Sequence, residues 1–148
     1  MTHIEHTVTI DRPVEEVWDY VMDARNDPKW MNNVIEVGRG ADEPVAVGLE
    51  IEETVKFAGV RIRTTYTITE HDPPRRSAID ARGPAGVRGT GRYVLEPVDG
   101  ATRFTMSTDA DAHRFFKLAE PVFARMARRD LASSAEHLKD LLEADGAP

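Results

Sequence analysis

The feature that most constrains this fold is one long amphipathic helix at the end of the chain. Apolar side chains recur at spacings of three and four residues between Phe116 and Leu142, which lines one broad face of a helix. Pro121 predicts either a bend or a fresh start near the beginning of that segment. The sequence predicts no other long helix. The apolar face of an accompanying sheet must therefore be covered by this helix.

The first thirty residues predict one strand and two short helices. Ile4, Val8 and Ile10 alternate with polar residues, as the residues of a half-buried strand do. A short amphipathic helix follows with Trp18 on its apolar face, and an Asp-Pro pair then opens a second helical turn that carries Trp30. Trp18 has more apolar neighbours at helical spacing, so we expect Trp18 in the core and Trp30 nearer to the mouth of a cavity.

The middle of the chain, from Val34 to Asp111, has the period of two that is typical of strands. Its β-rich runs are separated by short turns, and Asp99-Gly100 is the clearest hairpin signal among them. Six strands joined in this way predict an antiparallel meander. With the first strand and the helices, residues 1–148 predict a single α+β domain. In that domain a curved seven-stranded antiparallel sheet wraps a long C-terminal helix, and two short helices follow strand 1.

Composition excludes several classes of function. The 148 residues include no cysteine, which rules out disulfides, thiolate catalysis and cysteine-ligated metals. The formal net charge of −7 argues against nucleic-acid binding, and we interpret Arg125, Arg128 and Arg129 as a solvated helical face. No apolar run approaches the ~20 residues of a membrane span, and the start of the chain has no signal-peptide pattern, so we expect a cytoplasmic protein.

The order of the predicted segments resembles that of the helix-grip, or SRPBCC, superfamily. The matching stretches are residues 11–13 followed by VEEVWDYVMD, the DPKW turn, the YVLEPVDGATRFT hairpin and LKDLLE on the last helix. The family includes START lipid-transfer domains, birch-pollen-type allergens and bacterial polyketide cyclase/dehydrase-like proteins, and the chain looks like the last of these branches. The resemblance implies a cavity between sheet and helix for an apolar or aromatic small molecule, and none of its motifs is catalytic.

Strand alternation predicts which side chains face such a cavity. Glu53 and Phe57 share the inward face of one strand, and Tyr66 faces inward from the next. Gly89 and Gly91 leave space on a third strand, with a bulge as the alternative explanation. Ordinary core packing is the alternative for the two methionines of the predicted set. That ligand site comprises Trp30, Glu53, Phe57, Tyr66, Gly89, Gly91, Phe104, Met106, Phe123 and Met126.

Groups suited to acid/base catalysis are few. Glu53 and Tyr66 on neighbouring strands, with His6 on the first strand, are the candidate catalytic residues of an enolisation or aldol cyclisation. The alternative is that Glu53 pairs with an arginine or faces water. The five histidines have no metal-ligand spacing, so we expect neither a metal nor a cofactor.

Three functions are compatible with these features. The first is a non-catalytic carrier or sensor of a hydrophobic or aromatic small molecule, and the second is a polyketide cyclase or dehydratase. The third is a protein-interaction module with a vestigial cavity, and a homodimer is left open. Two titratable groups in one pocket would favour the enzyme, and a wholly apolar pocket would favour the carrier. A filled core beside a large exposed apolar patch would favour the interaction module.

Overall fold

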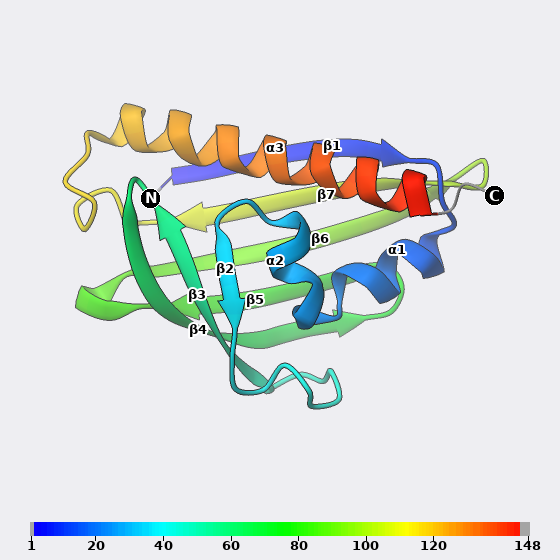
Figure 1. The fold of residues 1–148 in the computed structure, drawn as a ribbon, viewed down its shortest axis with the longest axis horizontal. Coiled ribbons are helices and arrows are strands. Elements are labelled where there is room, and N and C mark those ends of the chain that lie inside the picture. The colour runs from blue at the N-terminus through cyan, green and yellow to red at the C-terminus, as the bar shows by residue number, and fades with distance from the viewer. Residues whose placement is uncertain (1, 146–148) are drawn as a thin grey trace.

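A curved antiparallel sheet of seven strands wraps one long helix in the computed structural model, which describes residues 2–145 (Figure 1). The strands follow the order β1-β7-β6-β5-β4-β3-β2 across the sheet. The predicted α+β fold, with two short helices after the first strand, is confirmed. The elements are β1 (Thr2–Ile10), α1 (Val14–Val21), the 3-10 turn η1 (Ala24–Asn26), α2 (Asp27–Trp30), β2 (Val34–Val37), β3 (Glu50–Phe57), β4 (Val60–Asp72), β5 (Arg76–Arg82), the 3-10 turn η2 (Pro84–Gly86), β6 (Arg88–Val98), β7 (Ala101–Ala110) and α3 (Glu120–Asp145).

Two tight hairpins fix the register of the meander. Asp99 and Gly100 join β6 to β7, and Ala58 and Gly59 join β3 to β4, with positive φ at all four residues. Positive φ at both central positions gives the two-residue turn whose twist matches that of the flanking strands. The hairpin predicted at Asp99-Gly100 is confirmed. With register fixed, alternate residues of every strand in the meander face the helix side of the sheet.

The helix α3 starts later than the apolar pattern predicts. It begins at Glu120, whereas Phe116 lies in the turn before it. Pro121 occupies the first helical turn, where its missing N–H costs no hydrogen bond, and the helix then runs without a break to Asp145. Of the two alternatives predicted at Pro121, the structure has the fresh start. Within residues 2–145 no helix combines the length and apolarity that a bilayer crossing requires.

The core lies between the C-terminal half of α3 and the β1 edge of the sheet, where helix and strand run side by side (Figure 1). Ala135, Leu138 and Leu142 are the buried apolar residues of this half of the helix. Side chains of the first helix and of three strands complete one apolar cluster, which includes Val8, Ile10, Val17, Leu95 and Phe104. At this end, side chains therefore fill the space between helix and sheet.

Both tryptophans belong to this core, and Trp30 is the more deeply buried. Trp18 is 6% exposed and Trp30 is 0% exposed. The ring of Trp30 lies 6.1 Å from each of the rings of Tyr93 and Phe104. The expectation that Trp30 lies nearer to the cavity mouth is wrong. The 3-10 turn η1 changes the direction of the chain between α1 and α2. The number of apolar neighbours along each helix therefore does not predict which tryptophan is more buried.

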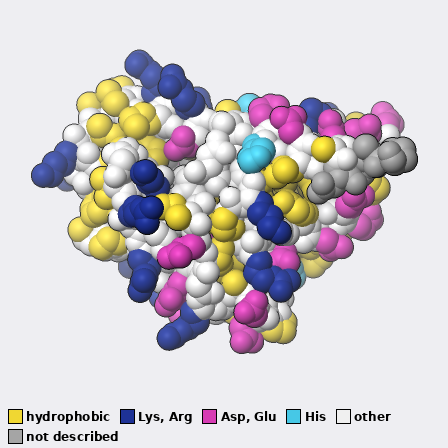
Figure 2. Space-filling model, in the orientation of Figure 1, with side chains coloured by type: hydrophobic (Ala, Val, Ile, Leu, Met, Phe, Trp, Pro, Cys, Tyr) yellow, Lys and Arg dark blue, Asp and Glu magenta, His cyan; other side chains and the backbone are white. Residues whose placement is uncertain are grey.

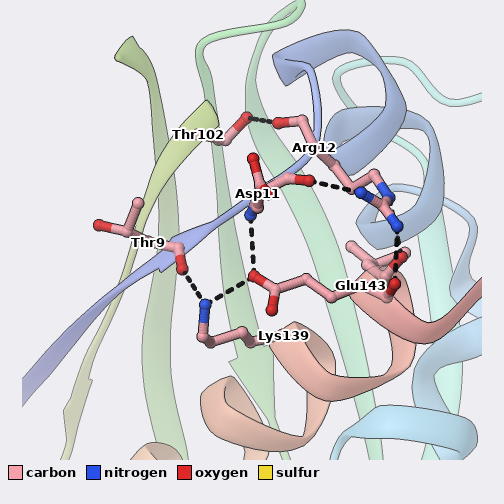
Figure 3. A network of polar contacts seen from close by, with 7 residues as sticks. Thr9, Asp11, Arg12, Thr102, Lys139 and Glu143 are labelled. Atoms are coloured by element: carbon pink, nitrogen blue, oxygen red, sulfur yellow. Dashed lines mark hydrogen bonds and ion pairs between the residues drawn. The ribbon is translucent and has the colours of Figure 1, made fainter. Parts of the chain in front are cut away.

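A polar network ties the C-terminal end of α3 to the chain that follows β1 (Figure 3). The guanidinium of Arg12 donates to the backbone carbonyl of Glu143 at 2.6 Å, which satisfies one of the free carbonyls of a helix end. The carboxylate of Glu143 accepts from the backbone N–H of Asp11 at 2.9 Å. Lys139 donates to that carboxylate at 2.6 Å and to the backbone carbonyl of Thr9 at 2.7 Å. The last turns of the helix are thus fixed by both side-chain and backbone partners.

Replacing Trp30 by alanine should lower the free energy of unfolding by ~3–5 kcal/mol, because the change opens a cavity in a fully buried aromatic cluster. Trp18→Ala should cost no more than Trp30→Ala. Urea denaturation midpoints of the two variants measure the difference, with Val47→Ala at a 63% exposed position as the control. A Trp18→Ala protein that is clearly the less stable of the two would contradict this assignment.

Candidate functional site

A cavity of about 320 Å³ lies between the sheet and the N-terminal half of α3. Its walls are mostly apolar, and small residues such as Ala81 on β5 and Ala127 on α3 leave the space unfilled. The larger apolar side chains around it include Ile51, Val55, Ile62, Ile68, Ile79 and Leu131. The fold therefore has one packed end and one hollow end under the same helix.

Gly89 and Gly91 line the cavity from β6, and they differ in what a side chain would meet. A Cβ at Gly89 would lie 3.1 Å from the backbone oxygen of Asp109, so the sheet itself favours glycine there. A Cβ at Gly91 would lie 3.2 Å from Cγ1 of Ile79, a side chain that can shift. Around both glycines, β6 pairs with its two neighbours without a register shift, so the bulge explanation is wrong. Gly91 is the position where the chain omits volume next to the cavity.

An aromatic cluster closes one end of the cavity. The ring of Phe57 on β3 lies 4.8 Å from that of Phe116 and 5.2 Å from that of Phe123 on α3. All three residues line the cavity. Figure 2 shows hydrophobic side chains gathered at this end of the molecule, where the β3–β4 turn and the segment before α3 lie, with Lys and Arg side chains around them. A ligand in the cavity would contact these aromatic rings.

Asp27, Glu53 and Tyr66 form one polar cluster on the cavity wall. The register pairs Ile51 with Tyr66 and Glu53 with Thr64, so Glu53 and Tyr66 are diagonal neighbours on the inner face. Asp27 is the first residue of α2, which brings a second carboxyl to the same place. Asp27 is 5% exposed and Glu53 is 7% exposed, so the alternative in which Glu53 faces water is wrong.

Burial and mutual interaction shift the protonation of this group. Burial raises the pKa of Asp27 well above its ordinary value, and hydrogen bonding with Glu53 and the charge of Glu53 raise it further. Burial also raises the pKa of Glu53, while hydrogen bonds with Asp27 and Tyr66 partly offset that rise. The pKa of Tyr66 is raised by burial first and then by the charges of the two carboxyls, so its phenol stays protonated. The pair can hold one proton on Asp27, which places a neutral acid beside a carboxylate.

Hydrogen bonding leaves this carboxyl pair incompletely satisfied. Among residues 2–145, neither Asp27 Oδ1 nor Glu53 Oε2 has a hydrogen-bond partner. Buried polar atoms in proteins are almost always paired with a protein group, with water or with a ligand. A proton held between the two carboxyls satisfies part of this need, and a molecule bound in the cavity can satisfy the rest.

The structure brings seven of the ten predicted ligand-site residues to the cavity wall: Glu53, Phe57, Tyr66, Gly89, Gly91, Met106 and Phe123. Trp30 and Phe104 lie instead in the core, where both are fully buried. Met126 is half-buried on α3 and lies outside the wall. The prediction is therefore wrong for these three residues. Sequence periodicity shows which side chains face the space between helix and sheet, but it does not distinguish the packed end of that space from the hollow end.

The candidate catalytic residue His6 also lies outside the cavity. Its Nε2 is 3.4 Å from the carboxylate of Glu136 on α3. The inward parity predicted for His6 is correct, but β1 is the edge strand that runs beside α3, so this face meets the helix surface. Of the three predicted acid/base residues, the structure brings Glu53 and Tyr66 together and separates His6 from them.

Among the cavity residues absent from the predicted site, four are aromatic or acidic. Tyr93 has the parity of Gly91 on the same strand, so alternation alone could have identified it. Asp130 is a polar residue on the apolar face of α3, which is also a readable signal. Phe116 lies in a turn and follows no helical period. Asp27 stands directly before a proline, which is the ordinary start of a helical turn, so no pattern indicated its burial.

The described residues 2–145 contain no group of three or more histidine, aspartate or glutamate side chains that could hold a metal ion. The cavity offers the carboxyls of Asp27, Glu53 and Asp130 and the phenols of Tyr66 and Tyr93 as its titratable groups, within apolar and aromatic walls.

Comparison with known proteins gives a family match over nearly the whole chain. A family model described as polyketide cyclase/dehydrase and lipid transport matches residues 1–143. The uncharacterized protein Rv1546 of Mycobacterium tuberculosis is 22% identical over 143 residues, which are 95% of this chain and 99% of that protein.

Solved structures share the fold. The Zhui aromatase/cyclase from Streptomyces sp. R1128 superposes with a TM-score of 0.76 at 20% identity, covering 99% of this chain and 98% of that one. A START superfamily protein from Mycobacterium smegmatis has a TM-score of 0.75 at 14% identity, covering 97% of this chain and 99% of that one. At these identities the structural matches indicate a common architecture.

Glu53→Gln should flatten the pH dependence of stability. A carboxyl whose folded pKa is raised stabilises the fold fully below its ordinary value of 4.5 and loses that contribution as the pH rises through the folded value. As the pH rises above that ordinary value, the wild type should therefore lose more free energy of unfolding than the variant. Urea denaturation at each pH measures the two free energies of unfolding.

Glu50→Gln is the matched control, because Glu50 lies on the same strand but on the outer face. There Arg82 donates to its carboxylate at 2.8 Å and lowers its pKa. The stabilising contribution of Glu50 is therefore lost as the pH falls, which is the opposite sign. Identical pH profiles for the wild type and Glu53→Gln would contradict the buried acid group.

Proposed function

Because the chain belongs to the polyketide cyclase/dehydrase and lipid transport family, we propose that it binds a hydrophobic or aromatic small molecule between the sheet and α3. The observation that carries this proposal is a mostly apolar cavity with a few convergent polar groups, which is the usual composition of a ligand site. A protein-interaction module would be favoured by a filled core, and this structure has an unfilled cavity instead.

The size of the cavity favours a compact ligand. Its volume of about 320 Å³ stands near the lower end of the roughly 300–1,000 Å³ that small-molecule pockets occupy. The aromatic rings of Phe57, Phe116 and Phe123 offer edges and faces to a planar molecule. A molecule of a few fused rings fits these walls better than a long acyl chain.

The second candidate function is acid/base catalysis on the bound molecule, and the convergence of Asp27, Glu53 and Tyr66 favours it. A carboxylate beside a neutral acid can remove a proton next to a carbonyl while the acid protonates the carbonyl oxygen. In this proposal Glu53 is the base, and Asp27 or Tyr66 is the acid. The resulting enol is the intermediate that aldol cyclisation and dehydration require. His6 has no role because it lies outside the cavity.

Filling the cavity should abolish ligand uptake. Gly91→Leu places a larger side chain beside Ile79, and it should weaken binding of the neutral probe N-phenyl-1-naphthylamine by about tenfold or more. Fluorescence titration measures the affinity. Thr90→Leu is the control, since Thr90 is the exposed neighbour on the opposite face of the same strand. Unchanged affinity in a folded Gly91→Leu protein would count against a ligand in this cavity.

Acid/base chemistry can be tested without knowledge of the natural substrate. The bicyclic ketone 1-tetralone exchanges its α-hydrogens for deuterium in D₂O through an enol, and NMR follows the loss of signal. We expect the wild type to accelerate this exchange over buffer, and Glu53→Gln to lose about 10²-fold or more of that acceleration because the base is gone. Glu50→Gln should behave as the wild type. Exchange at the buffer rate with a ketone that demonstrably binds would leave ligand binding as the function and reject catalysis.

A further inference from the structure

We propose that the cavity selects ring compounds that carry hydrogen-bond donors, as hydroxyl or protonated amino groups, and rejects those that carry a carboxylate. This inference rests on the proposed binding function and names the chemical class of its ligand. It is carried by the signs of the charged groups around the cavity and by the unsatisfied oxygens on its wall.

Every charged side chain that faces the cavity is acidic, within the part of the chain that the structure describes. Asp27 and Glu53 face it from α2 and β3, and Asp130 faces it from α3. Burial raises the pKa of Asp130 as well. The three carboxyls therefore approach the cavity from both the sheet side and the helix side, and an anion placed between them would meet the negative charge of the Glu53 carboxylate and no cation.

Three arginines also border the cavity, but the register turns their side chains away from it. Arg88 and Arg92 alternate with Gly89 and Gly91 on β6, so they point to the outer face of the sheet. Both arginines are exposed, whereas the two glycines are half-buried. Arg82 pairs with Arg88 across the sheet, and its guanidinium donates to the outer-face carboxylate of Glu50 at 2.8 Å. No guanidinium of this set is available to a carboxylate ligand inside the cavity.

The carboxyl pair presents hydrogen-bond acceptors to the cavity. Of the two unpartnered atoms, Glu53 Oε2 can only accept hydrogen bonds while that carboxyl is ionised, and Asp27 Oδ1 accepts when the proton of Asp27 lies on its other oxygen. Two hydroxyls beside the pair already have acceptors: Tyr66 donates to the carboxyl pair, and Thr64 Oγ1 donates to the backbone oxygen of Glu53 at 3.3 Å. A buried acceptor without a partner costs free energy, so a ligand that brings a donor recovers this cost and one that brings only acceptors does not.

Four naphthalenes with one apolar body and different substituents test the proposal: 1-methylnaphthalene, naphthalen-1-ylmethanol, 1-naphthylmethylamine and 1-naphthoate. Isothermal titration calorimetry at neutral pH gives the affinity of each. The alcohol and the amine should bind about tenfold or more tightly than the methyl compound, and 1-naphthoate should bind about tenfold or more weakly.

Variants then assign the preference to the carboxyl pair. Glu53→Gln and Asp27→Asn should each reduce the amine-to-methyl affinity ratio by about tenfold while 1-methylnaphthalene binds within about twofold of wild type. Glu50→Gln on the outer face should leave all four affinities unchanged. A ratio that survives in both folded cavity variants overturns the proposal, as does 1-naphthoate binding as tightly as the amine.

The outcomes separate this inference from the binding function on which it rests. If all four naphthalenes bind alike, the cavity binds ring compounds but does not select donors, and only the inference fails. If none of the four binds, the proposed binding function fails with it. Binding of the alcohol alone, without the amine, would contradict the role assigned to the acidic charge.

Discussion

The contact between one helix and one edge of the sheet is the interaction on which the rest of this structure depends. Leu138 and Leu142 of α3 fill the space above β1 and its neighbours, in one cluster with Ile10. The same helix has to extend over the remainder of a curved sheet, where the facing residues are as small as Ala81 and Gly91. The cavity thus follows from covering seven strands with a single helix that packs closely at only one end.

The acid group in the cavity carries an energetic cost that the core has to offset. Burying a carboxyl in apolar surroundings disfavours its ionised form, and Asp27 and Glu53 are buried side by side. Replacing both by apolar side chains of similar size would remove this cost, as is common for buried ion pairs. The rest of the sequence agrees with the fold, whereas these two buried carboxyls work against its stability. Residues that lower stability in this way are typical of functional positions.

Much of this arrangement could be predicted from the sequence, because its signals are periodic. Alternation along strands placed Glu53 and Tyr66 on the inner face, and the helical period identified α3. The burial of Asp27 and Trp30 could not be predicted, since it depends on how α2 turns after η1, and no period extends across that turn. Strand alternation tells which face of the sheet a residue lies on. It does not tell which part of α3 the residue faces, and that position decides whether the residue meets the core or the cavity. The expectations of a cytoplasmic location and of a homodimer stay predictions.

The uneven attachment of α3 has a consequence for its local stability. From Ala135 onward the helix is held by buried side chains and by the contacts of Arg12 with its last carbonyls. In the described segment from Glu120 to Asp130, Phe123 is the one buried residue. Since local opening follows local packing, unwinding the first turns costs less free energy than unwinding the last ones. One continuous helix therefore has two local stabilities, and its less stable half is the half that a ligand would touch.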